Sequence, residues 1–156
     1  MKPYEFTKPK PVPAANEVLV KVEASTINPR DNLFISGRYF KQLIPTNAGF
    51  EGCGRVEAVG CEALNDLIEK CVSFQTSAGS WAEYSTTSTY FLIDEDAVAS
   101  AASGIINPLA ALGFVQTYRK NKHAGIIHTP VASALGRQLV RLCRTENIML
   151  FKIVSS

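Results

Sequence analysis

The chain has 156 residues, of which 46% are hydrophobic and 19% are charged, and its formal net charge is +2 at pH 7. This composition excludes a disordered sequence, a collagen-like repeat and a solvated tail. A chain of this length buries about 70% of its unfolded surface, so it needs neither a disulfide nor a metal to form a core. Length alone therefore permits one self-sufficient domain.

Positive charge is too sparse along the chain to predict a nucleic-acid partner. Basic and acidic residues are interspersed, and the longest basic cluster is Arg119, Lys120 and Lys122 with His123. Recognition of a phosphate backbone uses a larger basic patch than this. We therefore expect no nucleic-acid binding.

The cysteines do not form a metal-binding pattern. Cys53, Cys61, Cys71 and Cys143 contain no C-x-x-C pair, and the chain has only two histidines. The usual structural zinc sites need four such ligands at characteristic spacings. The sequence therefore predicts no metal site, and the cysteines are expected to be free thiols in a reducing compartment.

Two segments bear on targeting and membranes. The N-terminus lacks the apolar stretch of a secretory signal. The uncharged run over residues 97–115 is long enough for a membrane span, but serines, a glycine and the Asn107-Pro108 pair interrupt it. We predict two core helices broken at this pair, and no membrane span.

The first half of the chain has the patterns of β-structure. Residues 1–16 contain four prolines and predict an extended lead-in. Over residues 17–23, valines alternate with mostly charged residues, as in a half-buried strand. Asn28 as N-cap, Pro29 at the first helical position and Gly37 as the stop predict a short helix.

Further short apolar segments predict the rest of this β-rich half. Residues 55–59 and 81–85 are bounded by glycines and are expected to be strands. Shorter apolar runs over residues 71–74 and 91–93 suggest two more.

Helical patterns begin after the acidic cluster at residues 94–96, which suits a helix N-terminus. We expect one helix over residues 97–105. A second should begin with Asn107 as N-cap and Pro108 at its first position, and run to the basic residues 119–122.

The C-terminal segment predicts a βαβ unit. An apolar strand is expected over residues 125–129 and another over residues 149–154. Between them lies a helical pattern whose apolar side chains share one face: Leu135, Leu139, Leu142 and Cys143. The unit has about the thirty residues that a βαβ motif needs.

Several motifs in this order resemble the medium-chain dehydrogenase/reductase superfamily. They are EVLVKV (17–22), INPRD (27–31), GFEGCG (49–54), Gly60, Asn107-Pro108 and the final βαβ unit. The resemblance implies a mixed β and α/β fold, with a GroES-like β-barrel domain followed by an incomplete Rossmann unit of one βαβ. We expect a barrel domain over residues 1–96, connecting helices over 97–124 and the truncated βαβ unit over 125–156.

The resemblance is to the zinc-free branch of this superfamily. Its zinc-dependent alcohol dehydrogenases carry histidine in a G-H-E motif, where this chain has Phe50, and a cysteine near the position of Ile27, which is absent here. A phenyl ring cannot coordinate zinc. We therefore expect no zinc, and the similarity is to enoyl-thioester reductases and quinone reductases.

Two residues of the first half are candidates for catalysis. In enoyl-thioester reductases a similar INPxD segment is followed by glycine, any residue and a tyrosine that assists proton delivery, and Gly37-Arg38-Tyr39 has this spacing. A phenol can donate to a developing enolate while staying neutral at pH 7. Tyr39 is alternatively a loop aromatic that packs on the barrel. Asn28 either orients a substrate carbonyl or only caps its helix.

The nucleotide-binding loop departs from the family pattern. Candidate cofactor-binding residues are Asn107, Ser133, Ala134, Leu135 and Gly136. Aligning Gly136 with the last glycine of G-x-G-x-x-G puts Val131 at the first glycine, where a β-branched side chain is poorly tolerated. The resemblance implies NADP as the cofactor, but we do not expect this chain alone to bind it.

The resemblance implies that the chain is shortened at both ends relative to the family. Its single βαβ unit would leave strand edges and one sheet face uncovered, so another protein chain is the expected partner. Two functions remain open: a zinc-independent NAD(P)H-dependent reductase that is inactive alone, or a non-catalytic structural or accessory subunit. The sequence could also be a fragment of a longer product. The expected location is mitochondrial or cytoplasmic.

Overall fold

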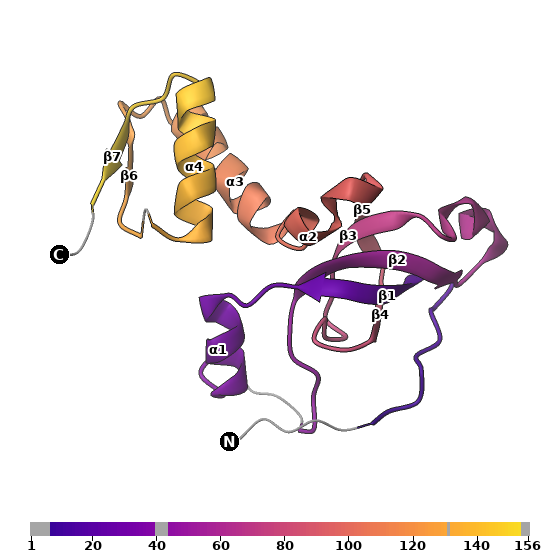
Figure 1. The fold of residues 1–156 in the computed structure, drawn as a ribbon. Helices are drawn as coiled ribbons and strands as arrows, with labels where there is room; N and C mark the ends of the chain where they lie inside the picture. Colours follow the sequence, from indigo (N-terminus) through magenta and orange to yellow (C-terminus); the bar gives the residue numbers. More distant parts are fainter. Residues whose placement is uncertain (1–6, 40–43, 131, 154–156) are drawn as a thin grey trace. The chain divides into compact units, whose positions relative to one another are not determined.

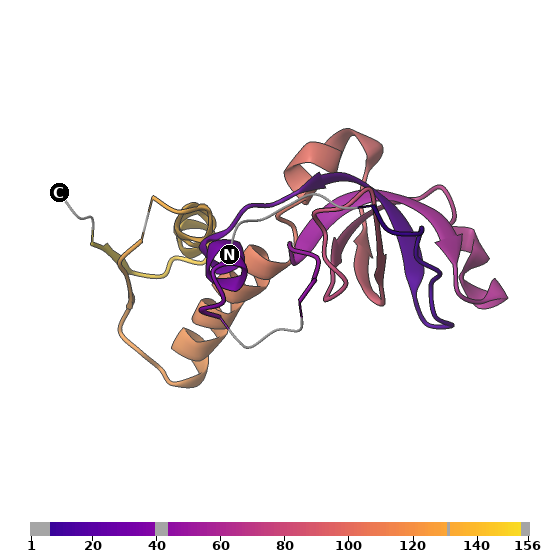
Figure 2. The same cartoon turned by 90° about the horizontal axis from the view of Figure 1, so that it is seen from below.

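The computed structural model describes residues 7–39, 44–130 and 132–153. The chain divides into two compact units, unit 1 over residues 1–104 and unit 2 over residues 105–156. Figures 1 and 2 show unit 1 as a curved sheet with short helices, and unit 2 as two helices against two strands. The fold class is confirmed as mixed β and α/β.

Unit 1 is built on a five-stranded antiparallel sheet. The strands are β1 (Val18–Ser25), β2 (Glu51–Val59), β3 (Cys71–Gln75), β4 (Tyr84–Thr87) and β5 (Thr89–Leu92). Their order in the sheet is β4-β1-β2-β3-β5. Because β1, β2 and β3 each have neighbours on both sides, they form the centre of the sheet.

The core of unit 1 lies on one face of these central strands. It consists of buried, mostly β-branched side chains: Val18, Val20, Val56, Val72 and Phe74. Such residues pack well on a pleated surface. Leu19, the exception to the alternation along β1, is also buried. A Cβ atom at Gly54 would clash with the backbone carbonyl of Lys21. Glycine therefore allows β2 to pair closely with β1 at this position.

Short helices accompany the sheet. Helix α1 (Pro29–Ile35) follows β1, two 3-10 turns occupy Glu62–Leu67 and Glu95–Ala97, and α2 (Val98–Ala101) follows the second turn. The expected helix over 97–105 is therefore only one turn long in its α-helical part. Ser103 and Gly104 have poor helix propensity and follow that turn, which accounts for its early end.

The strand expected over residues 81–85 begins later than predicted, at Tyr84. The indole Nε1 of Trp81 donates to the Thr26 carbonyl at 2.8 Å, and its backbone N–H donates to the Ala48 carbonyl at 3.0 Å. These bonds hold Trp81 in a bend instead of a strand ladder.

Unit 2 contains α3 (Ile106–Lys120), β6 (Ile126–His128), α4 (Ala134–Thr145) and β7 (Leu150–Lys152). Strands β6 and β7 are parallel, with Ile126 opposite Leu150, which confirms the βαβ unit. The predicted N-cap of α3 was wrong: the helix begins at Ile106, so Asn107 and Pro108 lie within its first turn. Proline, which lacks a backbone N–H, is tolerated there because an N–H in the first turn has no intrahelical acceptor.

The core of unit 2 lies between its two helices and one face of its two strands. Its buried members are Ala111, Val115, Ile126, Leu139, Cys143 and Ile148. Leu135 and Leu142 pack against this cluster, so the predicted apolar face of α4 is confirmed. No described helix is long and apolar enough to cross a bilayer.

Candidate functional site

Helix α1 begins at a tightly bonded N-terminus. Asn28 is the N-cap in an extended conformation and Pro29 is the first helical residue, as predicted. The Asp31 carboxylate accepts the backbone N–H of Asn28 at 2.6 Å, and the N–H of Asp31 donates to the Asn28 carbonyl at 2.9 Å. This pairing fixes the angle at which the chain leaves β1 and enters α1.

The side chain of Asn28 links α1 to the start of β2. Its amide nitrogen donates to Thr26 Oγ1 at 3.0 Å and to Glu51 Oε1 at 3.2 Å. The hydroxyl group of Thr26 also donates to this carboxylate oxygen, at 3.3 Å. The amide nitrogen of Asn28 thus already donates twice within the protein, and a role of Asn28 in orienting a substrate carbonyl remains a prediction.

Two carboxylates are almost fully buried at this junction. Asp31 and Glu51 are each 1% exposed. A buried carboxylate is costly unless hydrogen bonds compensate for lost water. The donors named above bind Asp31 Oδ2 and Glu51 Oε1, whereas Asp31 Oδ1 is buried without a hydrogen-bond partner in the described part of the chain. Glu51 belongs to the GFEGCG motif but was assigned no role from the sequence, because the residue type alone does not show that a carboxylate is buried.

An aromatic cluster lies beside this junction. The Phe50 ring meets the edge of Phe34 at a centroid distance of 4.9 Å and lies 6.2 Å from the Tyr39 ring. Tyr39 is 44% exposed, so its ring contacts the cluster while part of it reaches solvent. Both readings of Tyr39, packing and proton delivery, are compatible with this position.

Arg30 completes the cluster and was not among the predicted site residues. Its guanidinium carbon lies 3.9 Å from the centroid of Phe50 and 5.8 Å from that of Tyr39. Stacking on aromatic rings is a favourable environment for a guanidinium group. Nothing in the sequence pattern signalled this contact, since it joins α1 to the residue before β2.

The other predicted site residues lie in unit 2. Ser133 is the N-cap of α4, and its hydroxyl accepts the backbone N–H of Gly136 at 3.0 Å. Ala134 and Leu135 are the first two helical residues, so their N–H groups have no intrahelical acceptor. Asn107 lies in the first turn of α3. Val131, the residue that departs most from the glycine pattern, lies outside the described residues.

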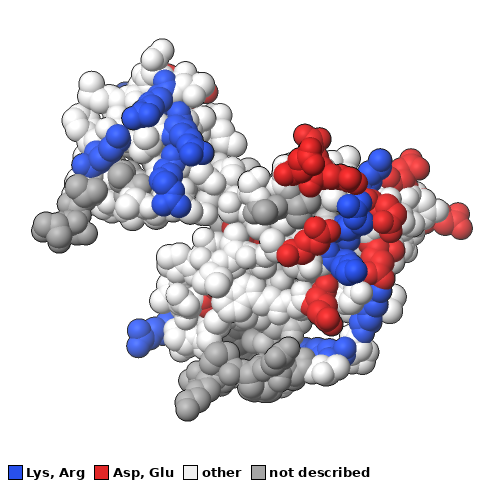
Figure 3. Space-filling model, viewed as in Figure 1, with Lys and Arg blue, Asp and Glu red and all other residues white. Residues whose placement is uncertain are grey.

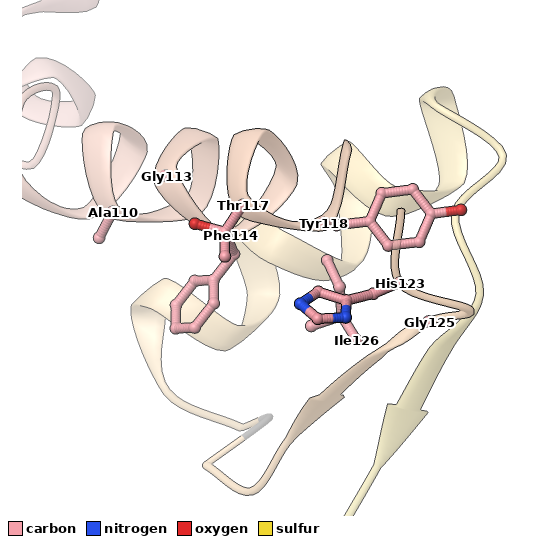
Figure 4. Close-up of a pocket in the computed structure, with 8 residues that line it drawn as sticks. All are labelled: Ala110, Gly113, Phe114, Thr117, Tyr118, His123, Gly125 and Ile126. Carbon is pink, nitrogen blue, oxygen red and sulfur yellow. The ribbon is translucent and has the colours of Figure 1, made fainter. Parts of the chain in front are cut away.

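Unit 2 contains two open hollows. One, of about 530 Å³, is lined by α3 and the start of β6; Figure 4 shows Phe114 projecting from α3 on the same side as His123. The other, of about 380 Å³, is lined by Ala132, Arg137, Val140, Arg141, Arg144 and Lys152. The second hollow adjoins the loop before α4 and is predominantly basic, so its chemistry suits an anionic group.

Metal ligands do not gather in the described part of the chain. Among those residues, no three side chains of His, Cys, Asp or Glu come together as a group that could hold an ion. Phe50 stands at the position where the zinc-dependent relatives are expected to carry histidine, and Arg30 covers its ring.

Comparison with protein families gives one match. The model of the alcohol dehydrogenase GroES-like domain matches residues 14–130, about three quarters of the chain. The match covers the sheet of unit 1 and continues into unit 2.

Reductases are among the proteins that are similar to this chain. The mitochondrial enoyl-[acyl-carrier-protein] reductase of Arabidopsis thaliana is 29% identical over 89% of this chain and 39% of its own length. The quinone oxidoreductase of Sus scrofa is 30% identical over 90% of this chain and 49% of its own length. A mycobacterial protein solved with NADPH is 27% identical with a TM-score of 0.80, over 97% of this chain and 47% of that structure.

The chain thus spans less than half the length of these relatives. Its sheet, its βαβ unit and the family match agree on one classification. The chain belongs to the alcohol dehydrogenase GroES-like domain family, within the medium-chain dehydrogenase/reductase superfamily.

Proposed function

We propose that this chain is part of a zinc-independent, NADPH-dependent oxidoreductase that reduces enoyl thioesters or quinones, and that it is inactive alone. The observation that carries the proposal is the position of Tyr39 against Phe50, with ring centroids 6.2 Å apart. A partly exposed phenol thus lies beside Phe50, the residue that stands at the histidine position of the zinc-dependent branch. The names of the relatives, enoyl reductases and quinone oxidoreductases, support the same reaction classes.

The chemistry assigned to Tyr39 is proton delivery. Addition of hydride to an enoyl thioester moves an electron pair toward the carbonyl oxygen, and the resulting enolate needs a proton at carbon. A phenol is protonated at neutral pH and can donate as this charge develops. The neighbouring Phe50 and Phe34 rings provide an apolar surface on which such an interaction is strengthened.

The experiment is the Tyr39→Phe variant in the complete native assembly of the protein, assayed for NADPH-dependent reduction of a crotonyl thioester and of a quinone. We expect thioester reduction to fall by about 100-fold or more, as for loss of a general acid. Tyr84→Phe is the control, because Tyr84 lies under Lys10 and outside the Phe50 cluster. An unchanged rate would remove Tyr39 from the mechanism, and reduction of neither substrate would contradict the enzymatic proposal.

NADPH is the nucleotide favoured by the residues of unit 2. The unbonded N–H groups of Ala134 and Leu135 suit a phosphate at a helix N-terminus, and Ser133 holds the remaining first-turn N–H. Arg137 and Lys152 line the basic hollow beside this loop, which matches the phosphate of NADPH better than the bare ribose of NADH. Bound there, the nucleotide would supply the hydride.

A second proposal is a non-catalytic, accessory role in a larger assembly. The observation that favours it is the uncovered face of the unit 2 sheet, where Ile127 is 65% exposed and Phe151 is 52% exposed. We infer that another protein chain covers this face. The location proposed for either role is mitochondrial or cytoplasmic.

Nucleotide binding separates the two proposals. We expect the native assembly to bind NADPH in the nanomolar-to-micromolar range, measured by quenching of Trp81 fluorescence or by calorimetry. No binding by the assembly would contradict the enzymatic role and favour the accessory one. Tight binding by the isolated chain would contradict both the accessory role and the expectation that this chain alone does not bind the nucleotide.

A further inference from the structure

Arg30 carries a polar atom that has no hydrogen-bond partner among the residues that the structure describes. Its Nη2 is buried and forms no hydrogen bond, and Arg30 takes part in none of the ion pairs among the described residues. A buried donor without an acceptor destabilises the folded state, and more so when it is charged. Such a group in a native protein calls for an explanation, and a ligand oxygen is one.

The guanidinium group is held in place by its apolar neighbours. Its guanidinium carbon lies 3.9 Å from the centroid of the Phe50 ring, which also contacts the edge of Phe34 and the ring of Tyr39. Stacking occupies the flat face of a guanidinium and leaves the N–H groups at its edge for hydrogen bonds. Arg30 is thus oriented by packing before any ligand arrives, which lowers the entropic cost of binding.

The acidic residues nearest in sequence have other donors. Asp31 accepts the N–H of Asn28, and Glu51 accepts the amide nitrogen of the same residue. Neither carboxylate lies within ion-pair distance of Arg30. Within the described ranges, the positive charge beside Tyr39 is therefore not neutralised by an ion pair.

We propose that Arg30 forms an oxyanion-binding site, in which its partly exposed guanidinium group donates to a negatively charged oxygen of a planar ligand lying against Phe50 and Tyr39. The ligand class is a carboxylate or an enolate. This inference deepens the proposed function and rests on it for the substrate. In both reductions considered above, hydride addition places negative charge on a carbonyl oxygen, which Arg30 would bind while Tyr39 donates the proton.

The assignment separates the roles of the two residues. A guanidinium group has five N–H donors and does not act as an acid in proteins, so in this assignment Arg30 binds the oxyanion without transferring a proton. Tyr39 is the proton donor. A preorganised cation at the oxygen where charge develops contributes transition-state stabilisation that water cannot match.

The test is an NMR titration of the full chain, without nucleotide, using crotonate as the probe and neutral crotonamide as its isostere. We expect crotonate to shift the Arg30 Nε–Hε and Tyr39 ring signals with a dissociation constant on the order of 1 mM, typical of one small anion contact. Crotonamide should bind at least tenfold more weakly. Equal shifts with both ligands, or none with either, would overturn the proposal.

Variants of Arg30 and Arg38 distinguish loss of the binding site from loss of folding. Arg30→Gln should abolish the crotonate shifts, and Arg30→Lys should retain part of the affinity because the charge stays but the planar fork is lost. Arg38→Gln is the matched control, since Arg38 is exposed and follows the same helix; it should bind as the wild type does. The amide signals of β1–β3 report folding. Full binding by a folded Arg30→Gln variant would contradict the site, whereas absent NADPH binding would contradict only the nucleotide proposal.

Discussion

The two units of this chain bury their apolar surface to different extents. Unit 1 has five strands and three central ones that are paired on both sides. Unit 2 has two strands of three residues each, with helices against one face and exposed apolar residues on the other. Isolated two-stranded sheets are marginal in water. The difference indicates that unit 1 buries its core between its own elements. In unit 2, only one of the two faces of the sheet is covered by helices.

The units also differ in charge, which the net value of +2 conceals. Residues 1–104 contain nine basic and thirteen acidic residues, a net charge of −4, and residues 105–156 contain seven basic residues and one acidic, a net charge of +6. Figure 3 shows the acidic side chains gathered on the sheet of unit 1 and basic ones over α4. An electrostatic argument about ligands must therefore be made for each unit separately.

The largest effect that would sharpen this comparison is expected from Leu139→Ala. Leu139 is fully buried in the core of unit 2, and truncation of such a residue costs about 2–5 kcal/mol. We expect this loss to unfold residues 105–156 while the sheet of unit 1 stays folded, as seen by amide NMR signals. Loss of signals from both units together would show that they fold as one body.

A pair of glycine substitutions should have opposite signs in the two units. In Gly54→Ala, the new Cβ would clash with the backbone of Lys21 across the central strands, and we expect a loss of about 1–3 kcal/mol. In Gly113→Ala, the new methyl group on α3 has open space, and helix propensity should stabilise by about 0.5–1 kcal/mol. Urea unfolding measures the change in unfolding free energy of both variants. A stabilised Gly54→Ala variant would contradict the close approach of β1 and β2 at this position.

A smaller, pH-dependent effect is expected from Cys53 in unit 1. Burial raises the pKa of its thiol from 9.0 to about 11. Between these values the native protein keeps the proton that the unfolded chain releases, so Cys53 lowers stability as pH rises from 9 to 11. The fall in unfolding free energy over this range should be shallower in Cys53→Ala than in the wild type. Identical slopes would contradict the buried thiol.

Much of the fold was predictable because its signals are local. The alternating valines of β1, the Asn28-Pro29 start of α1 and the apolar face of α4 each depend on neighbouring residues, and each is confirmed. The start of α3 was misplaced because Asn-Pro is also compatible with a position inside the first turn. Trp81 was assigned to a strand because its bonds to Thr26 and Ala48 are made by distant residues.

The site was predictable only where a motif carried it. Asn28, Tyr39 and Ser133 were selected by resemblance and spacing, and the structure gives each a definite position without testing its role. Arg30 was missed because its significance lies in the absence of a hydrogen-bond partner and in a stack on Phe50. Both are properties of tertiary packing that no sequence period reveals.

Native-state hydrogen exchange on the isolated chain tests the central difference between the units most directly. The account predicts slow exchange for amides of β1, β2 and β3, and exchange at least about 100-fold faster for β6 and β7, because local stability follows buried contacts. Equal protection in both units would contradict it, since unit 2 would then be stable without any chain covering its exposed sheet face.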